Sequence, residues 1–298
     1  MPKALIIVLL VLASLIIVGI IAGKKIMEYM ENASEYAKLK EGVELTKDMN
    51  MIAHRGLSAV APENTISAFK LAAKAGFKYV ETDIRRTKDG YWVVMHDATV
   101  DRMTDGTGAI EELTLEEIRK LKITRGSGIE KYDNEGVPTL KEYVDVVTSG
   151  GSYPVIEIKA KGTFDFKDLV YTLKEYNITD KAVVIDYDID QLRTIRKLCP
   201  ELQMQILGHV AKNKFIKAAE EIGNCGLDIM HNLQTDNRTM KRIREKGLPI
   251  NFWTVDNEKT LEKIYKMGAS YATTNTLAPV VSQKDDFAPI ASADEVFQ

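Results

Sequence analysis

Three acidic residues stand where two apolar runs end, and their spacing suits a metal ion. Glu81 and Asp83 are two residues apart in the run 79–84, so a β-strand there places both carboxylates on one face. Glu157 lies in a second apolar run, 154–158. Clustered carboxylates supply the oxygen ligands that Mg²⁺ and Ca²⁺ prefer, so we expect these three residues to bind a divalent cation of this kind.

Two histidines and two basic residues stand at the ends of similar runs. His54 and Arg55 follow one apolar run, His96 follows another, and Lys159 comes two residues after Glu157. Imidazoles act as acid and base near neutral pH, and arginine and lysine supply the positive charge that a phosphate needs. A hard cation, two imidazoles and two basic side chains together suit the cleavage of a phosphodiester.

Each of these residues alone has a simpler interpretation. A histidine at a strand end is more often structural than catalytic, and Glu157 with Lys159 is compatible with a local ion pair. Trp253 is more often a core residue, because large aromatic side chains are usually buried. His231 lacks charged companions at a strand end and is interpreted as structural. Only the combination favours a catalytic site.

The elements that must position these residues are strands that alternate with helices. Eight apolar runs are predicted strands: 51–54, 79–84, 154–158, 182–185, 203–207, 227–230, 250–255 and 271–273. Helical periodicity marks, among others, 67–75, 190–198, 239–246 and 259–267. The alternation predicts an α/β fold, a (β/α)8 TIM barrel with its functional groups at the carboxyl ends of the strands. A doubly wound sheet is the alternative, but no glycine-rich nucleotide turn follows any strand.

One segment interrupts the alternation. An Asp-Gly dipeptide at Asp89 follows the second predicted strand and predicts a β-hairpin arm, whose second strand leads to His96. A four-residue turn would place His96 opposite Glu81, and a two-residue turn would place it opposite Asp83. Both registers bring His96 beside the carboxylate pair.

The bulk composition excludes several kinds of partner. The 40 Lys and Arg residues against 43 Asp and Glu residues leave a formal charge of -3, so no general basic character attracts nucleic acid or an anionic surface. The two cysteines, Cys199 and Cys225, form neither a disulfide framework nor a metal-binding spacing. We expect no nucleic-acid partner.

Residues 4–22 contain no charged side chain and are predicted to form a transmembrane helix. At about 1.5 Å per residue, such a helix nearly matches a hydrocarbon core of about 30 Å. A cleaved signal peptide is the alternative, but its apolar core is shorter, roughly 7–15 residues, and a small-residue cleavage site is missing here. We therefore expect a single-pass anchor in the cell membrane. Lysines on both sides of the run leave the side of the catalytic domain open.

These patterns divide the chain into four parts. Residues 1–25 are the predicted transmembrane anchor, and residues 26–48, rich in Glu and Lys, are a predicted linker or stalk. Residues 49–280 contain the alternating strands and helices, and residues 281–298 are a predicted polar tail. The sequence thus predicts one catalytic domain held at a membrane.

Several motifs resemble those of the glycerophosphodiester phosphodiesterase family. AHRGLSAVAPENTISAF resembles the opening block of the family, VETDIRRTKDGYWVVMHD its second block, and PTLKEYVD the entry to the following helix. VIEIK, FWTVDN and TTN resemble the later blocks in the same order, so the resemblance spans roughly residues 49–279. Because members of this family are (β/α)8 enzymes of the phospholipase-C-like phosphodiesterase type, the resemblance implies the same barrel.

Carried over by position, the resemblance also implies a role for each candidate residue. His54 and His96 would be the general acid and base, in an order that the sequence leaves open. Arg55 and Lys159 would contact the phosphate, and Trp253 would border the glycerol pocket. The implied ligands of the divalent cation are Glu81, Asp83 and Glu157.

The sequence therefore predicts a membrane-anchored, metal-dependent enzyme of lipid metabolism. It would hydrolyse small glycerophosphodiesters to sn-glycerol 3-phosphate and an alcohol. One alternative is a phospholipase C or D that acts on intact lipid, which an anchored enzyme can reach. Another is a non-catalytic barrel that binds or scaffolds at the membrane, although the full set of carboxylates and histidines speaks against it.

Overall fold

The structure, a computed structural model, describes residues 49–132, 134–231 and 235–279. The predicted anchor (1–25), the predicted stalk (26–48) and the predicted polar tail (281–298) lie outside these residues. Within the described part of the chain, no helix is long and apolar enough to cross a membrane.

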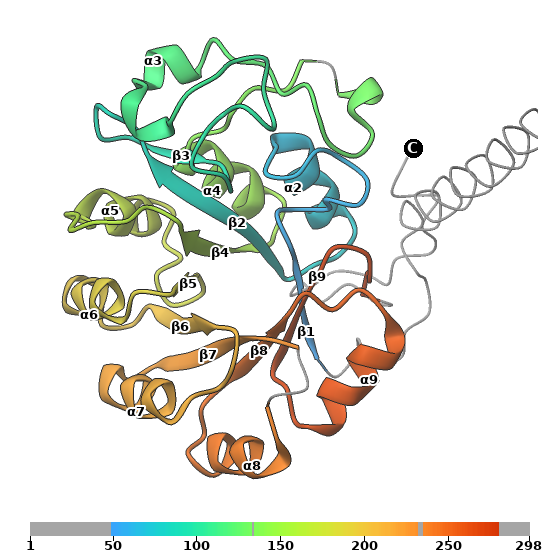
Figure 1. The fold of residues 1–298 in the computed structure, drawn as a ribbon, viewed down its shortest axis with the longest axis vertical. Coiled ribbons are helices and arrows are strands. Elements are labelled where there is room, and N and C mark those ends of the chain that lie inside the picture. Colours follow the sequence, from blue (N-terminus) through green and yellow to red (C-terminus); the bar gives the residue numbers. More distant parts are fainter. Residues whose placement is uncertain (1–48, 133, 232–234, 280–298) are drawn as a thin grey trace, which may run out of the picture. The chain divides into compact units, whose positions relative to one another are not determined.

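Nine strands in the described residues form one sheet, and eight of them run parallel around a barrel (Figure 1). The parallel strands are β1 (Asn50–Ala53), β2 (Tyr79–Arg86), β4 (Tyr153–Ile158), β5 (Val183–Asp186), β6 (Gln203–Gly208), β7 (Cys225–Met230), β8 (Ile250–Trp253) and β9 (Tyr271–Thr274). β1 pairs with β9 on one side and with β2 on the other, which closes the barrel. The predicted (β/α)8 fold is therefore confirmed, and the doubly wound alternative is wrong because such a sheet stays open at its edges.

Helices connect successive strands and lie on the outside of the barrel (Figure 1). They are α2 (Ile66–Lys74), α4 (Leu140–Ser149), α5 (Lys167–Glu175), α6 (Ile189–Leu198), α7 (Asn213–Ile222), α8 (Asn237–Glu245) and α9 (Glu258–Lys266). Each buries an apolar stripe against the strands; in α9, for example, Leu261 and Ile264 are buried. The four helices predicted above correspond to α2, α6, α8 and α9, with ends that differ by at most two residues.

Helix α4 shows how local sequence and packing fix one of these elements. Thr139 and Glu142 form a reciprocal capping box at its start, which satisfies two backbone N–H groups that the first turn leaves unpaired. Tyr143 is fully buried, and its hydroxyl donates to the Val80 carbonyl at 2.5 Å and accepts from the Val155 N–H at 3.2 Å. The helix is thereby attached to β2 and β4, the two strands that carry the acidic residues.

The predicted hairpin arm is present, but both predicted registers are wrong. β3 (Trp92–Val94) runs antiparallel to the end of β2, and Ile84 pairs with Val94. This pairing leaves a three-residue turn, which lies between the predicted two-residue and four-residue turns. Continued along the strand, the register puts Thr82 and not a carboxylate opposite His96.

Side-chain hydrogen bonds account for the three-residue turn. The Thr87 hydroxyl accepts from the Tyr91 N–H at 2.8 Å and donates to the Asp89 carboxylate at 2.7 Å. Gly90 has a φ of 87°, the left-handed conformation that ends such a turn and that glycine adopts without strain. An Asp-Gly pair alone does not reveal this contribution of the preceding threonine.

The long connection from β3 to α4 packs around its own apolar cluster. It contains the short helix α3 (Leu115–Ile118) and two 3₁₀ turns, η2 (Ile110–Glu112) and η3 (Ile129–Lys131). Buried side chains of the cluster include Val100, Ile118 and, from β3, Val93. The hairpin that leads to His96 is thus supported by a folded segment on its outer side.

Candidate active site

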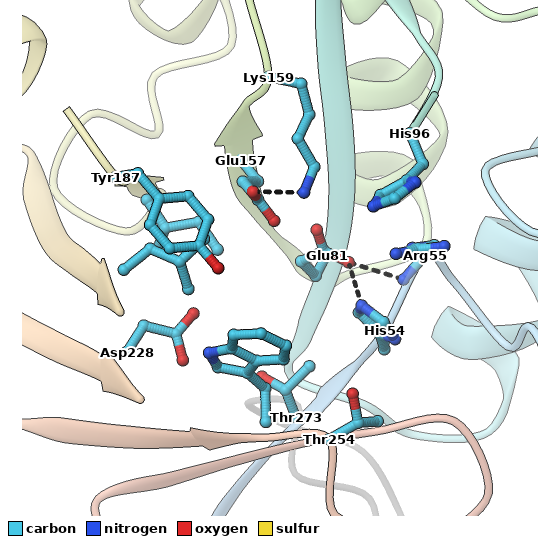
Figure 2. A pocket seen from close by; sticks show the side chains of 13 residues that line it. His54, Arg55, Glu81, His96, Glu157, Lys159, Tyr187, Asp228, Thr254 and Thr273 are labelled. Carbon is cyan, nitrogen blue, oxygen red and sulfur yellow. Dashed lines mark hydrogen bonds and ion pairs between the residues drawn. The ribbon is translucent and has the colours of Figure 1, made fainter. Parts of the chain in front are cut away.

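A pocket of about 240 Å³ lies at the carboxyl ends of the barrel strands (Figure 2). The predicted site residues that line it are His54, Arg55, Glu81, His96, Glu157, Lys159 and Trp253. The remaining one, Asp83, is fully buried beside the pocket, 3.2 Å from the Arg55 Nε and 3.4 Å from the Lys159 Nζ. The structure therefore brings all eight predicted residues together.

The turn after β1 explains the His-Arg-Gly sequence. Arg55 has a φ of 57°, and its backbone N–H donates to the Glu81 Oε2 at 2.8 Å. Gly56 has a φ of 76°, and a Cβ there would lie 2.7 Å from the backbone of Ala68, so only glycine fits. This turn lets the adjacent side chains of His54 and Arg55 both face the pocket (Figure 2).

Glu81, Asp83 and Glu157 form a buried carboxylate triad. Each offers one oxygen, and these oxygens lie within 4.8 Å of one another. Burial and the two neighbouring carboxylates raise the pKa of Glu81 well above its ordinary value. Burial and Asp83 raise the pKa of Glu157 to about 7. Although burial opposes it, Arg55 and Lys159 hold the pKa of Asp83 below its ordinary value.

The triad fits a divalent cation. The Glu81 Oε1 is buried and has no hydrogen-bond partner among the residues that the structure describes. A buried carboxylate oxygen is unfavourable without a donor or a cation beside it. Three oxygen donors without sulfur or imidazole suit hard cations such as Mg²⁺ or Ca²⁺.

His54 is oriented by an amide at the end of β9, the strand that pairs with β1. Its Nδ1 lies 2.8 Å from the Asn275 Oδ1, and the Asn275 Nδ2 donates to the Asp256 Oδ2 at 2.7 Å. Because Asp256 takes the amide N–H, the amide oxygen faces the imidazole, and the His54 Nδ1 must be the donor. The Nε2 is then the free acceptor, 4.0 Å from the Glu81 Oε2. Burial and Arg55 lower the pKa of His54 to about 4.

His96 is oriented by a carboxylate instead of an amide. Its Nδ1 lies 2.8 Å from the Asp97 Oδ1, and the other oxygen of Asp97 accepts from the Arg102 Nε at 2.5 Å. Although burial raises it, hydrogen bonds from Arg102 and His96 lower the pKa of Asp97 to about 2. The partner of His96 is thus an anion, whereas the partner of His54 is neutral.

Two further side chains hold the site together and were not singled out from the sequence. The Arg85 guanidinium donates to the carbonyls of His96 and Lys159, and the Asn64 Nδ2 donates to the Asp83 Oδ2 at 2.8 Å. A signal for Arg85 existed, because it follows Asp83 by two residues and therefore shares its strand face. Asn64 stands just before a helix, where an asparagine is usually interpreted as a capping residue, so the sequence does not indicate its hydrogen bond to Asp83 on β2.

The pocket has a second wall, which strands β5 to β9 form. Its lining residues are Ile185, Tyr187, Leu207, Asp228, Trp253, Thr254 and Thr273. Of these, only Trp253 was a candidate from the sequence. Asp228 follows Leu227 inside an apolar run, which gives no sign that its side chain faces a pocket.

Comparison with known proteins adds a family to this geometry. The family model described as "Glycerophosphoryl diester phosphodiesterase family" matches residues 54–278. A glycerophosphodiester phosphodiesterase of Caldanaerobacter subterraneus subsp. tengcongensis is 33% identical over 222 residues, which cover 73% of this chain and 90% of that protein. A glycerophosphodiester phosphodiesterase of Bacillus subtilis is 30% identical over 244 residues, covering 75% and 82%.

Solved structures give the same result. A phosphodiesterase from Oleispira antarctica, solved in complex with the product sn-glycerol-3-phosphate, superposes with a TM-score of 0.68 at 28% identity. The match covers 76% of this chain and 93% of that one. The range of the family model, residues 54–278, contains every residue that lines the pocket.

Proposed function

The chain belongs to the glycerophosphoryl diester phosphodiesterase family, a family of phosphoric diester hydrolases, and we propose how its pocket performs that hydrolysis. The substrates are glycerophosphodiesters, and the products are sn-glycerol 3-phosphate and an alcohol. The observation that carries the assignment is the convergence of a carboxylate triad, two imidazoles and two cationic side chains in one pocket. The related structure that holds sn-glycerol-3-phosphate supports the same product here.

Mg²⁺ or Ca²⁺ is the proposed cation, with Glu81, Asp83 and Glu157 as its ligands. When bound, the cation supplies positive charge beside the phosphate and lowers the pKa of the substrate hydroxyl that attacks phosphorus. Arg55 and Lys159 bind the non-bridging phosphate oxygens and stabilise the negative charge that grows on them during the reaction.

In the first step, His54 acts as the base. Its Nδ1 donates to Asn275, so its Nε2 accepts the proton of the glycerol 2-hydroxyl while the hydroxyl oxygen attacks phosphorus. His96 acts as the acid. Although burial and Arg55 lower the pKa of His96, its ring is bonded to the Asp97 carboxylate, which stabilises the protonated form. The ring of His54 is bonded to a neutral amide instead. The His96 Nε2 gives its proton to the leaving alcohol as the phosphorus–oxygen bond to that alcohol breaks. A cyclic phosphodiester of glycerol remains.

In the second step, water opens the cyclic phosphodiester. The now neutral His96 takes a proton from the attacking water, and the protonated His54 returns its proton to the 2-oxygen as that oxygen leaves phosphorus. Both histidines end in the protonation states in which they began, and sn-glycerol 3-phosphate is released.

The test uses the full chain with glycerophosphocholine and a divalent cation. A coupled assay measures released glycerol 3-phosphate, and we expect turnover in the wild type, loss in His54→Ala, and retention in His231→Ala. His231 is the matched control because its side chain does not line the pocket. A second substrate arm contains phosphatidylinositol. Cleavage of that lipid in preference to glycerophosphocholine would instead support a phospholipase.

We also propose that residues 4–22 anchor the protein in the cell membrane as a single span. The support is the uncharged run itself, with Lys3 before it and Lys24 and Lys25 after it. Extraction with alkaline carbonate should leave the full chain in the membrane fraction and release a form that lacks residues 1–24. Protease protection in sealed vesicles then assigns the side of the catalytic domain.

A further inference from the structure

The second wall of the pocket contains polar groups to which the reaction above gives no role. Asp228 on β7 and Trp253 on β8 both line the pocket. The two strands pair directly, with Asp228 beside Asn251 and Met230 beside Trp253. The two side chains therefore belong to one continuous surface. Asp228 lies across the pocket from Glu157 and Lys159 (Figure 2).

Asp228 is buried and only partly satisfied. Its side chain is 2% exposed, and Asn251 hydrogen-bonds to it, while the Asn251 Nδ2 also donates to the Thr273 Oγ1 at 2.8 Å. In the described structure the Asp228 Oδ1 has no hydrogen-bond partner, and Figure 2 shows the carboxyl group directed into the pocket. A buried polar atom usually has a hydrogen-bond partner, so the unpaired Asp228 Oδ1 indicates that a ligand atom binds there.

Trp253 presents a second unsatisfied group in the same surface. Its indole Nε1 is buried and is likewise without a partner among the described side chains and backbone groups. An indole N–H is only a donor, so the atom that it binds must be an acceptor. The two free groups lie on adjacent strands and face one pocket, which makes a shared ligand the simplest explanation.

The chemistry of the two groups selects a hydroxyl. Burial raises the pKa of Asp228 well above its ordinary value, so its carboxyl group can both donate and accept a hydrogen bond. A hydroxyl also donates and accepts, whereas a phosphate would meet no cation on this wall. The cations that suit a phosphate, Arg55 and Lys159, line the other wall.

The size of the pocket selects the glycerol part of the substrate. A volume of about 240 Å³ accommodates a phosphate and a short carbon chain, and glycerol is the part that all glycerophosphodiesters share. When the 2-hydroxyl lies at the carboxylate triad, the terminal hydroxyl is one carbon further along. We propose that Asp228 and the Trp253 indole bind this terminal hydroxyl and make the enzyme selective for glycerol. This assignment rests on the proposed function.

The test is a cycle of two substrates and several variants of the full chain. One substrate is glycerophosphocholine, and the other is its analogue built on propane-1,2-diol, which keeps the attacking hydroxyl and lacks the terminal one. The wild type should prefer the glycerol substrate by roughly 5- to 150-fold in kcat/KM, because the analogue leaves buried polar groups unpaired. Asp228→Leu should reduce this preference to near one, and Asp228→Asn should retain much of it. Trp253→Phe should reduce it partly.

Each preference is a ratio measured on one preparation, so a partly unfolded variant does not distort it. Asp186→Asn is the matched control, because Asp186 is also buried with a free carboxyl oxygen but does not line the pocket. Its preference should equal that of the wild type. An unchanged preference in Asp228→Leu would overturn the proposal.

Two further outcomes separate the subsite from the proposed function. Equal rates of the wild type on both substrates would overturn the subsite and leave the phosphodiesterase activity standing. No hydrolysis of either substrate would overturn both. If Asp228→Leu changed the preference between choline and ethanolamine substrates and not the glycerol preference, Asp228 would face the leaving alcohol, and the assignment to glycerol would be wrong.

Discussion

The Arg85 side chain holds the backbone of His96 in place. Its Nε and Nη2 donate to the His96 carbonyl at 2.9 and 2.6 Å, and its Nη1 donates to the Lys159 carbonyl at 3.1 Å. The ladder between β2 and β3 ends one residue before His96, where the Met95 N–H donates to the Asp83 carbonyl. Beyond that point no ladder hydrogen bond is described for His96, and the Arg85 guanidinium binds its carbonyl instead. One planar group thus positions the backbone of both His96 and Lys159.

Replacement of Arg85 by leucine should therefore lower kcat/KM by about 100-fold. A misplacement of catalytic groups by about 1 Å has an effect of this size, and the variant leaves His96 and Lys159 in the chain but unsupported. Arg85→Lys should recover part of the loss, since one ammonium can still reach a carbonyl. Steady-state kinetics with glycerophosphocholine measure both effects.

The matched control for this prediction is Arg86→Leu. Arg86 is the next residue, pairs with Asp168 at 2.9 Å and lies over the Trp92 ring, and it does not line the pocket. Its kcat/KM should stay near that of the wild type. Equal losses in the two variants, or a folded Arg85→Leu enzyme with full activity, would show that Arg85 has no positioning role.

Removal of the divalent cation should abolish activity and also lower thermal stability. A ligand that binds only the folded state at 100 times its dissociation constant stabilises that state by about 2.7 kcal/mol. Readdition of Mg²⁺ or Ca²⁺ to chelator-treated protein should therefore raise the melting temperature of the wild type. Glu157→Gln should show a smaller rise, because one anionic ligand becomes neutral.

The control for the cation prediction is Asp186→Asn, which also removes a buried carboxylate but not one of the triad. Its melting temperature should respond to the cation like that of the wild type. A full response in Glu157→Gln would remove Glu157 from the set of ligands.

Asp186 itself should make stability depend on pH. Burial raises the pKa of this carboxyl group to about 8, against about 3.9 in an unfolded chain. Between these values the native state holds a proton that the unfolded state has lost, so the free energy of unfolding falls as pH rises from about 4 to 8. Asp186→Asn should flatten this part of the profile and gain stability, on the order of a few kcal/mol, at pH 8. Denaturant titrations at several pH values give the profiles, and parallel profiles for both proteins would contradict the assignment.

The fold could be predicted because strand and helix periodicities alternate along the chain. Apolar runs such as 203–207 and 227–230 match β6 and β7 closely, since strands covered by helices must be apolar along most of their length. The hairpin register could not be predicted, because the hydrogen bond from the Tyr91 N–H to the Thr87 hydroxyl stabilises a turn of three residues. A side-chain hydrogen bond of that kind leaves no periodic signal.

The site was predictable to the extent that chemistry-bearing residues stand at strand ends. The carboxylate triad and His54 meet in the structure because all parallel strands of a barrel end on one side. His96 joins them through the antiparallel hairpin of β2 and β3. Asp228 escaped this reasoning because no second charged residue shares its face of β7, whereas Glu81 and Asp83 stand together on one face of β2, so only the pocket reveals Asp228. The partners of the two histidines were equally hidden, since Asn275 is 221 residues from His54.

Those partners lead to a prediction that separates the two histidines. His54→Ala and His96→Ala should each reduce kcat by at least about 100-fold on glycerophosphocholine, within the range of general acid–base catalysis. A substrate with p-nitrophenol as its alcohol needs little protonation when that alcohol leaves. First-turnover release of p-nitrophenolate, which reports the first step alone, should therefore be largely restored in His96→Ala and little restored in His54→Ala. Steady-state turnover of His96→Ala should stay low, because the opening of the cyclic phosphodiester still needs His96 as its base.

Asp97→Asn extends the same experiment to the group that orients His96. A neutral amide stabilises the protonated imidazole less than a carboxylate does, so this variant should lose activity on glycerophosphocholine and recover first-turnover release on the p-nitrophenyl substrate, as His96→Ala does. Asp101→Asn is its control, because Asp101 accepts only from the Gly108 N–H at the surface among the hydrogen bonds described and should change neither rate. Equal rescue of His54→Ala and His96→Ala would contradict the division of roles. Rescue of His54→Ala alone would reverse it, with His96 as the base and His54 as the acid.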